Sequence, residues 1–186
     1  MIKLTTQQLA QILNADLIGD EQAVVENINT DTRKSVSNSL FFALKGEHFD
    51  AHQYLDKAVE QGAAALVVQQ ANTEIATPQL VVADTRLALG QLAKWLREKI
   101  NPHIVAMTGS SGKTTVKEMT ASILQQTAGN PEAVLFTNGN FNNDIGVPLT
   151  LLRLTEQHKF AVIELGANHQ GEIDYTTHLA QPEAAL

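Results

Sequence analysis

The sequence contains no cysteine, few aromatic residues and no long hydrophobic run. The lack of cysteine excludes disulfides, thiolate zinc sites and cysteine nucleophiles. No apolar run approaches the roughly 18 residues that a membrane-spanning helix needs. The first residues, Met1–Gln7, also lack the apolar core of a signal peptide. We therefore expect a soluble cytoplasmic protein that does not insert into membranes.

Basic residues are also scarce, because 13 lysines and arginines face 20 acidic residues, for a formal net charge of −7 at pH 7. A general nucleic-acid binder needs a basic face for the phosphate backbone, so nucleic acid is not an expected partner. Hydrophobic residues make up 44% of the chain, which favours a folded core over disorder. Any phosphate-bearing ligand must therefore be held by a local site.

Two blocks separate near Lys99–Pro102, and the first of them, residues 1–100, reads as a small α/β domain. The apolar spacing and the capping residues Thr5 and Asp84 predict three helices, and Gly62 is an expected helix end. Buried strands are predicted where short apolar runs occur. The expected helices cover 5–15, 54–61 and 84–98, and the expected strands cover 24–28, 40–44, 64–68 and 80–83.

The second block, residues 103–186, predicts a parallel sheet with helices on its faces, because strands and helices alternate along it. The expected strands are 104–107, 134–136 and 160–165, and the expected helices are 113–126 and 145–153. Gln181–Leu186 reads as the entry to another buried strand. About 84 residues fall short of the ~100–150 usual for such a domain, so we expect an incomplete domain and a fragment of a longer protein.

A phosphate-binding loop is predicted between the apolar run Ile104–Met107 and the helix that follows it. Such a loop presents backbone N–H groups, and the helix N-terminus adds positive potential. A lysine then reaches the terminal phosphates and a hydroxyl side chain binds Mg²⁺, here Lys113 and Thr114. The general pattern has glycine where this chain has Met107, and the alternative is a turn that binds nothing. The nucleotide-binding residues expected are Thr108, Gly109, Ser110, Ser111, Gly112, Lys113, Thr114 and Thr115.

Glu164 ends a buried strand in the same block, at the position where a magnesium-side carboxylate usually lies beside such a loop. Mg²⁺ takes few protein ligands and keeps waters and phosphates. Thr114 and Glu164 are therefore the expected metal ligands, and Lys113 and Glu164 the expected catalytic residues. The alternative is a glutamate that is merely solvated.

Three further segments are candidates for contacts with a substrate. Thr137–Pro148 is rich in asparagine, which offers uncharged donors and acceptors but also suits turns. Asn29–Arg33 is a second candidate, and the alternative for it is a turn with an Asp–Arg pair that contacts no substrate. The histidines show no metal-ligand spacing, and only His169 follows closely after Glu164.

Together these residues resemble the Mur ligase family of ATP-dependent amide-forming enzymes. That family's loop, T-G-[ST]-[NS]-G-K-T, lacks the first P-loop glycine, and Thr108–Thr114 matches it. Glu164–Ile173 and the asparagine loop look like the branch that adds D-alanyl-D-alanine to a UDP-N-acetylmuramoyl-tripeptide during peptidoglycan synthesis. Residues 31–34 and 43–52 look like its UDP-binding domain. The resemblance covers essentially the whole chain.

The resemblance implies a UDP-binding domain at 1–100, a truncated P-loop ATPase domain at 103–186, and a C-terminal domain that this chain does not contain. It implies ATP and Mg²⁺, activation of a carboxylate as an acyl phosphate, and a monomer. The fragment alone would be inactive. The substrate-binding residues it implies are Asp31, Thr32, Arg33, Asn140, Asn142, Asn143 and His169.

Three other functions are compatible with parts of the sequence. A sibling Mur ligase or a folylpolyglutamate-type ligase would share the loop, but is not expected to share Glu164–His169. A P-loop GTPase would need an Asn-Lys-x-Asp motif, which the sequence lacks. A non-catalytic module that binds only the UDP precursor stays open for the fragment.

Overall fold

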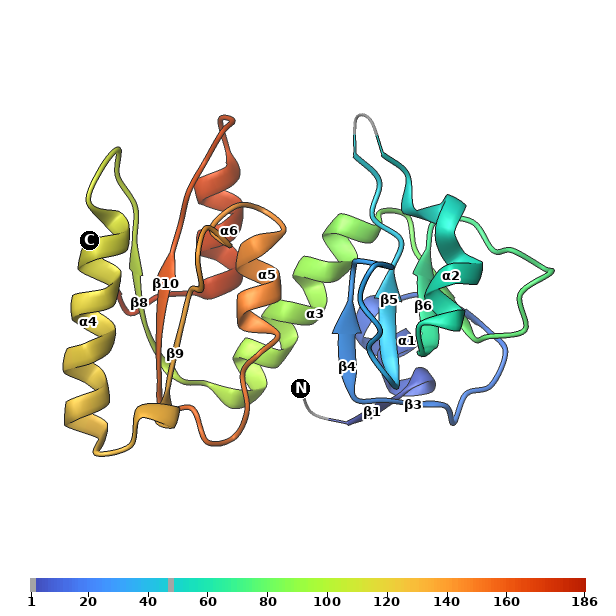
Figure 1. Cartoon of the computed structure of the whole chain (residues 1–186), viewed down its shortest axis with the longest axis horizontal. Coiled ribbons are helices and arrows are strands. Elements are labelled where there is room, and N and C mark those ends of the chain that lie inside the picture. The colour runs from blue at the N-terminus through green and yellow to red at the C-terminus, as the bar shows by residue number, and fades with distance from the viewer. Residues whose placement is uncertain (1–2, 47–48) are drawn as a thin grey trace. The chain divides into compact units, whose positions relative to one another are not determined.

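The computed structural model describes residues 3–46 and 49–186, which form two compact units, Met1–Leu89 and Gly90–Leu186. The units divide inside helix α3 (Thr85–Ile100), whereas the sequence placed the boundary after it. The start of α3 is held by the first unit, where the Thr85 hydroxyl donates to the Ala43 carbonyl at 2.9 Å. The rest of α3 is held by the second unit through Arg97. Figure 1 shows the elements of each unit.

The first unit contains a five-stranded sheet in the order β2-β7-β6-β5-β4. Strands β4, β5, β6 and β7 run parallel to one another, and β2 is antiparallel to β7. A separate antiparallel pair joins β1 and β3. The strands are β1 (Leu4–Thr5), β2 (Asp16–Ile18), β3 (Val24–Val25), β4 (Asn27–Asn29), β5 (Ser39–Phe42), β6 (Ala63–Val68) and β7 (Gln79–Val81).

Helices α1 and α3 begin where the sequence supplies a capping side chain. Thr5 and Gln8 form a capping box at the start of α1 (Thr6–Leu13), which satisfies two backbone N–H groups that the helix itself leaves free. Asp84 accepts from the first N–H groups of α3. The short helices η1 (Ala51–Tyr54) and α2 (Leu55–Glu60) follow β5. Ala58 and Leu55 pack against Phe41 and Leu66 in the core of the unit.

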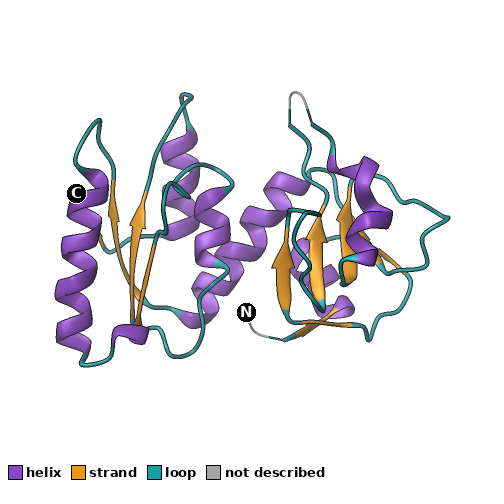
Figure 2. Ribbon diagram, in the orientation of Figure 1, coloured by secondary structure: helices purple, strands orange, loops and turns teal. Residues whose placement is uncertain are grey.

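The second unit is a four-stranded parallel sheet in the order β11-β8-β10-β9. Helix α4 lies on one side of these strands and α5 and α6 on the other, as Figure 1 and the ribbon in Figure 2 show. The expected parallel sheet with helices on both faces is confirmed. Its elements are β8 (His103–Met107), α4 (Lys113–Ala128), η2 (Pro131–Ala133), β9 (Val134–Phe136), α5 (Gly146–Leu151), β10 (Phe160–Glu164), α6 (Glu172–Ala180) and β11 (Ala184–Ala185).

The register of this sheet brings the two candidate motifs to one edge. Glu164, the last residue of β10, pairs with Met107, the last residue of β8. The loop that follows Met107 therefore lies beside the segment that follows Glu164. The carboxyl ends of parallel strands are where ligands bind in open α/β sheets. In the described part of the chain, no helix is both long and apolar enough to cross a membrane.

Arg97 fastens α3 to the end of α6. Its guanidinium, in a side chain only 6% exposed, donates to the carbonyls of Ala180 and Gln181 and to the Asn101 side chain, each at 2.9 Å. Arg97→Met should lower the free energy of unfolding by about 2–3 kcal/mol, because the buried carbonyls lose charge-assisted partners. Urea denaturation measures this against Lys94→Met on the same helix. Equal losses in the two variants would show that the guanidinium contacts add nothing.

Candidate functional site

The loop between β8 and α4 has the backbone of a phosphate cradle. Gly109 and Gly112 have φ angles of 140° and 78°, a region that only glycine adopts readily. The helix begins at Lys113, so its unpaired N-terminal N–H groups line the loop. Met107, where the general pattern has glycine, is 2% exposed and packs in the core with Ala121 and Val162. The methionine that replaces the usual glycine therefore adds a side chain to the core, and the loop that would hold the phosphates is unchanged.

The remaining loop side chains are largely available to a ligand. Thr108, Ser110, Ser111 and Thr115 are exposed. The Lys113 ammonium lies back over the loop and donates to the Gly109 carbonyl at 2.6 Å. The ammonium is therefore held at the loop by this backbone contact. An anionic oxygen bound in the loop could replace the Gly109 carbonyl as its partner.

Glu164 lies directly beside this loop and is only 3% exposed. Its Oε2 accepts from the Thr114 hydroxyl at 3.2 Å, and its Oε1 accepts from the Asn142 amide at 2.8 Å. Its backbone N–H donates to the hydroxyl of buried Thr137 at 3.0 Å. Thr114 and Asn142 thus each hold one oxygen of the carboxylate, while Thr137 holds the backbone of Glu164.

This pair of oxygens suits a hard cation. A carboxylate and a hydroxyl are ligands that Mg²⁺ accepts, while its remaining positions go to waters and phosphate oxygens. Within residues 3–46 and 49–186, no group of three or more histidine or acidic side chains could hold a metal by itself. The donors at Thr114 and Glu164 therefore fit a nucleotide-borne magnesium ion rather than a resident metal held by the protein alone.

A buried lysine completes the cluster. Lys117 is 1% exposed, and its ammonium lies 3.1 Å from Glu118 Oε1 and 3.9 Å from Glu164 Oε2. It stands three residues after Thr114, so both side chains project from the same face of α4. That spacing is the sequence signal that could have predicted Lys117 as part of the site.

Among the asparagines of the loop, Asn142 is the one that contacts Glu164 in the described residues. The N–H of Gly166 donates to the Asn142 carbonyl at 2.7 Å. Asn143 turns to the start of α5, where its side chain accepts from Gly146 at 2.8 Å. Asn140 is exposed, and its carbonyl accepts from the Asn142 N–H. His169 is exposed in the segment before α6.

The first unit contains a separate groove of about 600 Å³ at the predicted Asp–Arg turn. The rings of Phe49 and Tyr54 stack there with centroids 5.6 Å apart and planes inclined by 10°. Both rings are partly exposed, at 55% and 41%. Sequence reasoning did not single them out, because four residues separate them and only the fold brings their rings together. The groove is lined by Thr30, Asp31, Thr32, Arg33, Phe41, Phe49, Ala51, Tyr54 and Lys57.

The turn at this groove is fixed by a two-point ion pair. Arg33 Nε and Nη2 donate to the two Asp31 carboxylate oxygens at 2.8 and 2.9 Å. The Arg33 side chain, and to a smaller extent the Arg33 backbone N–H, lowers the pKa of Asp31 from 3.8 to about 2. Asp31 therefore stays ionised far into acid, and the turn keeps a fixed charge pattern.

Arg33→Ala should return the pKa of Asp31 toward 3.8, because the main stabilisation of the carboxylate is lost. A lowered folded-state pKa contributes stability above the unfolded value and loses it as the pH falls. The stability difference between the parent chain and Arg33→Ala should therefore shrink as the pH drops from about 4 to about 2. NMR titration of the Asp31 carboxyl carbon measures the pKa. An unchanged pKa in the variant would contradict the pairing.

Comparison with known proteins agrees with both halves of this arrangement. Residues 24–97 match the Mur ligase family catalytic domain, and residues 107–186 match the Mur ligase middle domain. The chain belongs to the Mur ligase family. The family resemblance seen in the sequence is thereby confirmed.

Full-length relatives show how much of a Mur ligase this chain spans. It is 82% identical over 186 residues to the UDP-N-acetylmuramoyl-tripeptide--D-alanyl-D-alanine ligase of Haemophilus influenzae, covering 100% of this chain and 41% of the relative. The Escherichia coli protein of the same name is 56% identical over 100% of this chain and 40% of its own length. The chain thus spans about 40% of the length of these curated relatives.

Solved structures of Mur ligases share the fold. A crystal structure of MurF from Acinetobacter baumannii matches with a TM-score of 0.92 at 47% identity, covering 100% of this chain and 40% of that one. MurF from Thermotoga maritima in complex with ADP matches with a TM-score of 0.75 at 28% identity, covering 85% and 36%. The expected α/β class is confirmed by these likenesses.

Proposed function

We propose that this Mur ligase chain belongs to an enzyme that uses ATP to join D-alanyl-D-alanine to a UDP-N-acetylmuramoyl-tripeptide in peptidoglycan precursor synthesis. The observation that carries the proposal is the contact of Glu164 with Thr114 at the edge of the phosphate loop. The names of the H. influenzae and E. coli relatives supply the substrates. The enzyme would act in the cytoplasm as a monomer, as the sequence led us to expect.

The loop from Thr108 to Thr115 would hold the ATP phosphates. Its N–H groups and the start of α4 offer a concentrated positive potential. Lys113 would leave the Gly109 carbonyl and move to the terminal phosphates, where its charge offsets the repulsion between the triphosphate and an incoming carboxylate. The ADP complex of the T. maritima relative supports a nucleotide in this domain.

Thr114 and Glu164 would hold Mg²⁺ on the phosphates. A bound Mg²⁺ supplies charge neutralisation at the transferring phosphoryl group. Asn142 and Lys117 orient the Glu164 carboxylate for that task, because they occupy its other contacts. The buried position of Glu164 keeps water from competing for the same oxygens.

The UDP precursor would bind the groove of the first unit. Asp31, Thr32 and Arg33 form one part of its lining, and the Phe49–Tyr54 pair forms another. Exposed aromatic faces stack on nucleobases whatever their sequence, and Lys57 adds a cation for a phosphate. Asn140, Asn142, Asn143 and His169 would contact the substrate near the ATP site.

The proposed reaction has two steps. The precursor's terminal carboxylate attacks the γ-phosphorus of ATP, forming an acyl phosphate and releasing ADP. The D-alanyl-D-alanine amine then attacks the acyl carbon, forming the amide, expelling inorganic phosphate and losing a proton. Holding two anions together is the main barrier, and the cations at the loop reduce it.

A hybrid enzyme tests the activity. This chain would replace the corresponding segment of the H. influenzae relative, to which it is 82% identical, giving what we call the hybrid ligase. The hybrid ligase should release ADP only when ATP, the UDP-tripeptide and D-alanyl-D-alanine are all present, and mass spectrometry should find the joined product. ADP release that another amine supports equally well would instead favour a sibling ligase.

The 186 residues alone favour a second, narrower function, a module that binds the UDP precursor without turnover. This reading is supported by the location of the aromatic groove entirely within the first unit. Calorimetry of the chain with ADP and with the UDP-tripeptide, in separate titrations, distinguishes the two. Binding of the precursor without the nucleotide favours the module for the isolated chain and leaves the hybrid ligase as the test of catalysis.

A further inference from the structure

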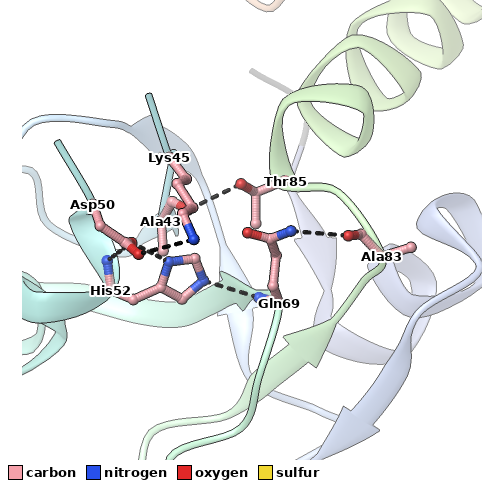
Figure 3. Close-up of polar contacts among 7 residues, drawn as sticks. All are labelled: Ala43, Lys45, Asp50, His52, Gln69, Ala83 and Thr85. Carbon is pink, nitrogen blue, oxygen red and sulfur yellow. Dashed lines mark hydrogen bonds and ion pairs between the residues drawn. The ribbon is translucent and has the colours of Figure 1, made fainter. Parts of the chain in front are cut away.

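A second cavity of the first unit, about 650 Å³ in volume, has a polar lining that the proposed reaction does not use. Lys45, Asp50, His52 and Gln69 lie along it, beside Ala83. Figure 3 shows how these residues join the ends of neighbouring strands. Ala43 follows β5, Gln69 follows β6 and Ala83 follows β7, so the contacts cross the carboxyl edge of the parallel part of the sheet.

His52 is the centre of this network, and its two ring nitrogens have different partners. Nε2 accepts from the Gln69 backbone N–H at 3.0 Å, and Nδ1 lies 2.6 Å from Asp50 Oδ1. Since Nε2 accepts, the ring proton sits on Nδ1 and is donated to Asp50. The His52 side chain is 19% exposed. The neutral imidazole thus connects the end of β6 to the carboxylate of Asp50.

Asp50 lies in the segment 49–51, which also carries Phe49 and pairs with the segment 44–46; we call these two described segments the hairpin. Lys45 pairs with Asp50 in an antiparallel bridge, the Gly46 N–H donates to the Phe49 carbonyl at 2.8 Å, and the Ala51 N–H donates to the Leu44 carbonyl at 3.0 Å. Neighbouring residues of this hairpin line different cavities. Asp50 lines the polar cavity, whereas Phe49 lines the aromatic groove.

Further contacts hold both ends of the hairpin in place. The His52 backbone N–H, and to a smaller extent the His52 imidazole, lowers the pKa of Asp50. The Lys45 ammonium lies 3.8 Å from Oδ2, the other carboxylate oxygen of Asp50. Gln69 is itself fixed by its side chain, which donates to the Ala83 carbonyl at 3.0 Å, and Ala43 is fixed by the Thr85 hydroxyl. The sheet therefore supplies a rigid frame, and His52 is the side chain that ties the hairpin to it.

We propose that His52 is a positioning residue for the substrate's nucleobase: it anchors the hairpin to the end of β6, so that Phe49 stays stacked on Tyr54 at the aromatic groove. This inference rests on the proposed binding of the UDP precursor there. Without the imidazole, the hairpin keeps its own backbone bonds but loses its link to Gln69. The ring of Phe49, which is 55% exposed, then depends on its stacking with Tyr54 and on the backbone bonds of the hairpin for its position.

The first test is structural and needs no ligand. In the 186-residue chain, the nuclear Overhauser contacts between the Phe49 and Tyr54 rings should be lost or strongly weakened in His52→Ala. They should stay weak in His52→Asn, whose amide can still donate to Asp50 but does not supply the Nε2 acceptor for the Gln69 N–H. Gln53→Ala, a change at the exposed neighbour, should leave them intact. Unchanged ring contacts in a folded His52→Ala chain would overturn the proposal.

The second test uses calorimetric titration of the same chains with the UDP-tripeptide. His52→Ala should weaken binding of the UDP-tripeptide about tenfold, which is the usual effect of losing one hydrogen bond that holds a site in its binding conformation. The affinity for ADP should stay unchanged. In a Phe49→Ala background, His52→Ala should weaken precursor binding no further. Additive losses would show that His52 acts by another route.

The two tests separate the inference from the function on which it rests. If the parent chain binds no UDP-tripeptide, the proposed substrate site fails, and the ring contacts still decide the role of His52. If His52→Ala does not fold, as judged by urea denaturation, His52→Asn and His52→Gln take its place. The latter keeps an acceptor for the Gln69 N–H but loses the donor to Asp50, so each variant isolates one of the two contacts.

Discussion

Lys113→Ala in the hybrid ligase should lower the rate of ADP release by on the order of a hundredfold to a thousandfold, the usual cost of removing one aligned charge contact from a transition state. The Lys113 ammonium is already positioned at the loop by the Gly109 carbonyl. Its loss removes the cation that offsets two converging anions and leaves the cradle's backbone unchanged. Steady-state assay of ADP at saturating substrates measures the effect.

Lys159→Ala is the matched control for Lys113. Lys159 is exposed and precedes β10, so it lies at the opposite end of that strand from Glu164. This variant loses the same charge from the protein and should keep the parent rate. If Lys113→Ala also retained a near-normal rate, the assignment of the loop as the site of phosphoryl transfer would be contradicted.

Glu164→Gln should lower turnover of the hybrid ligase by on the order of a hundredfold and raise the Mg²⁺ concentration needed for half-maximal rate. Glutamine keeps the shape of the side chain but removes the charge that fits a cation beside Thr114. A second readout is the Mg²⁺ dependence of ADP binding by calorimetry, which should weaken in the variant. This readout does not depend on turnover.

The control for this change is Glu156→Gln, in an exposed turn of the same unit. It should leave both the rate and the Mg²⁺ dependence unchanged. Parent-like Mg²⁺ dependence in Glu164→Gln would mean that Glu164 serves the fold alone. In that case the contacts of Glu164 with Asn142 and Lys117 would stabilise the fold and would not orient the carboxylate for a cation.

The fold was predictable wherever local signals agreed with the sheet. Thr5 and Asp84 mark helix starts correctly, because capping is a local interaction. The expected strand over 24–28 is instead two strands, since Val24–Val25 pairs with β1 and Asn27–Asn29 pairs with β5. Strand Asp16–Ile18 was not predicted, because three residues at a sheet edge carry little apolar pattern.

The candidate site was predictable where chain direction alone brings residues together. Thr114 and Glu164 follow the carboxyl ends of adjacent parallel strands, so their proximity could be inferred from the alternating pattern. The spacing of Lys117 from Thr114 indicates that both lie on one face of α4, and Lys117 does contact Glu164. The contact of His52 with Gln69 depends instead on how far the imidazole reaches across the packed elements. Such distances follow from the tertiary packing and have no signature in composition or spacing.

The most direct test of the proposed chemistry is isotope transfer during a single turnover of the hybrid ligase. The UDP-tripeptide would carry ¹⁸O in both oxygens of its terminal carboxylate, and the released phosphate would be analysed by mass spectrometry. Attack of that carboxylate on the γ-phosphorus, followed by displacement by the amine, leaves one ¹⁸O in inorganic phosphate. The proposed two-step reaction predicts this labelled phosphate together with ADP. Unlabelled phosphate, or ¹⁸O found in AMP, would contradict it.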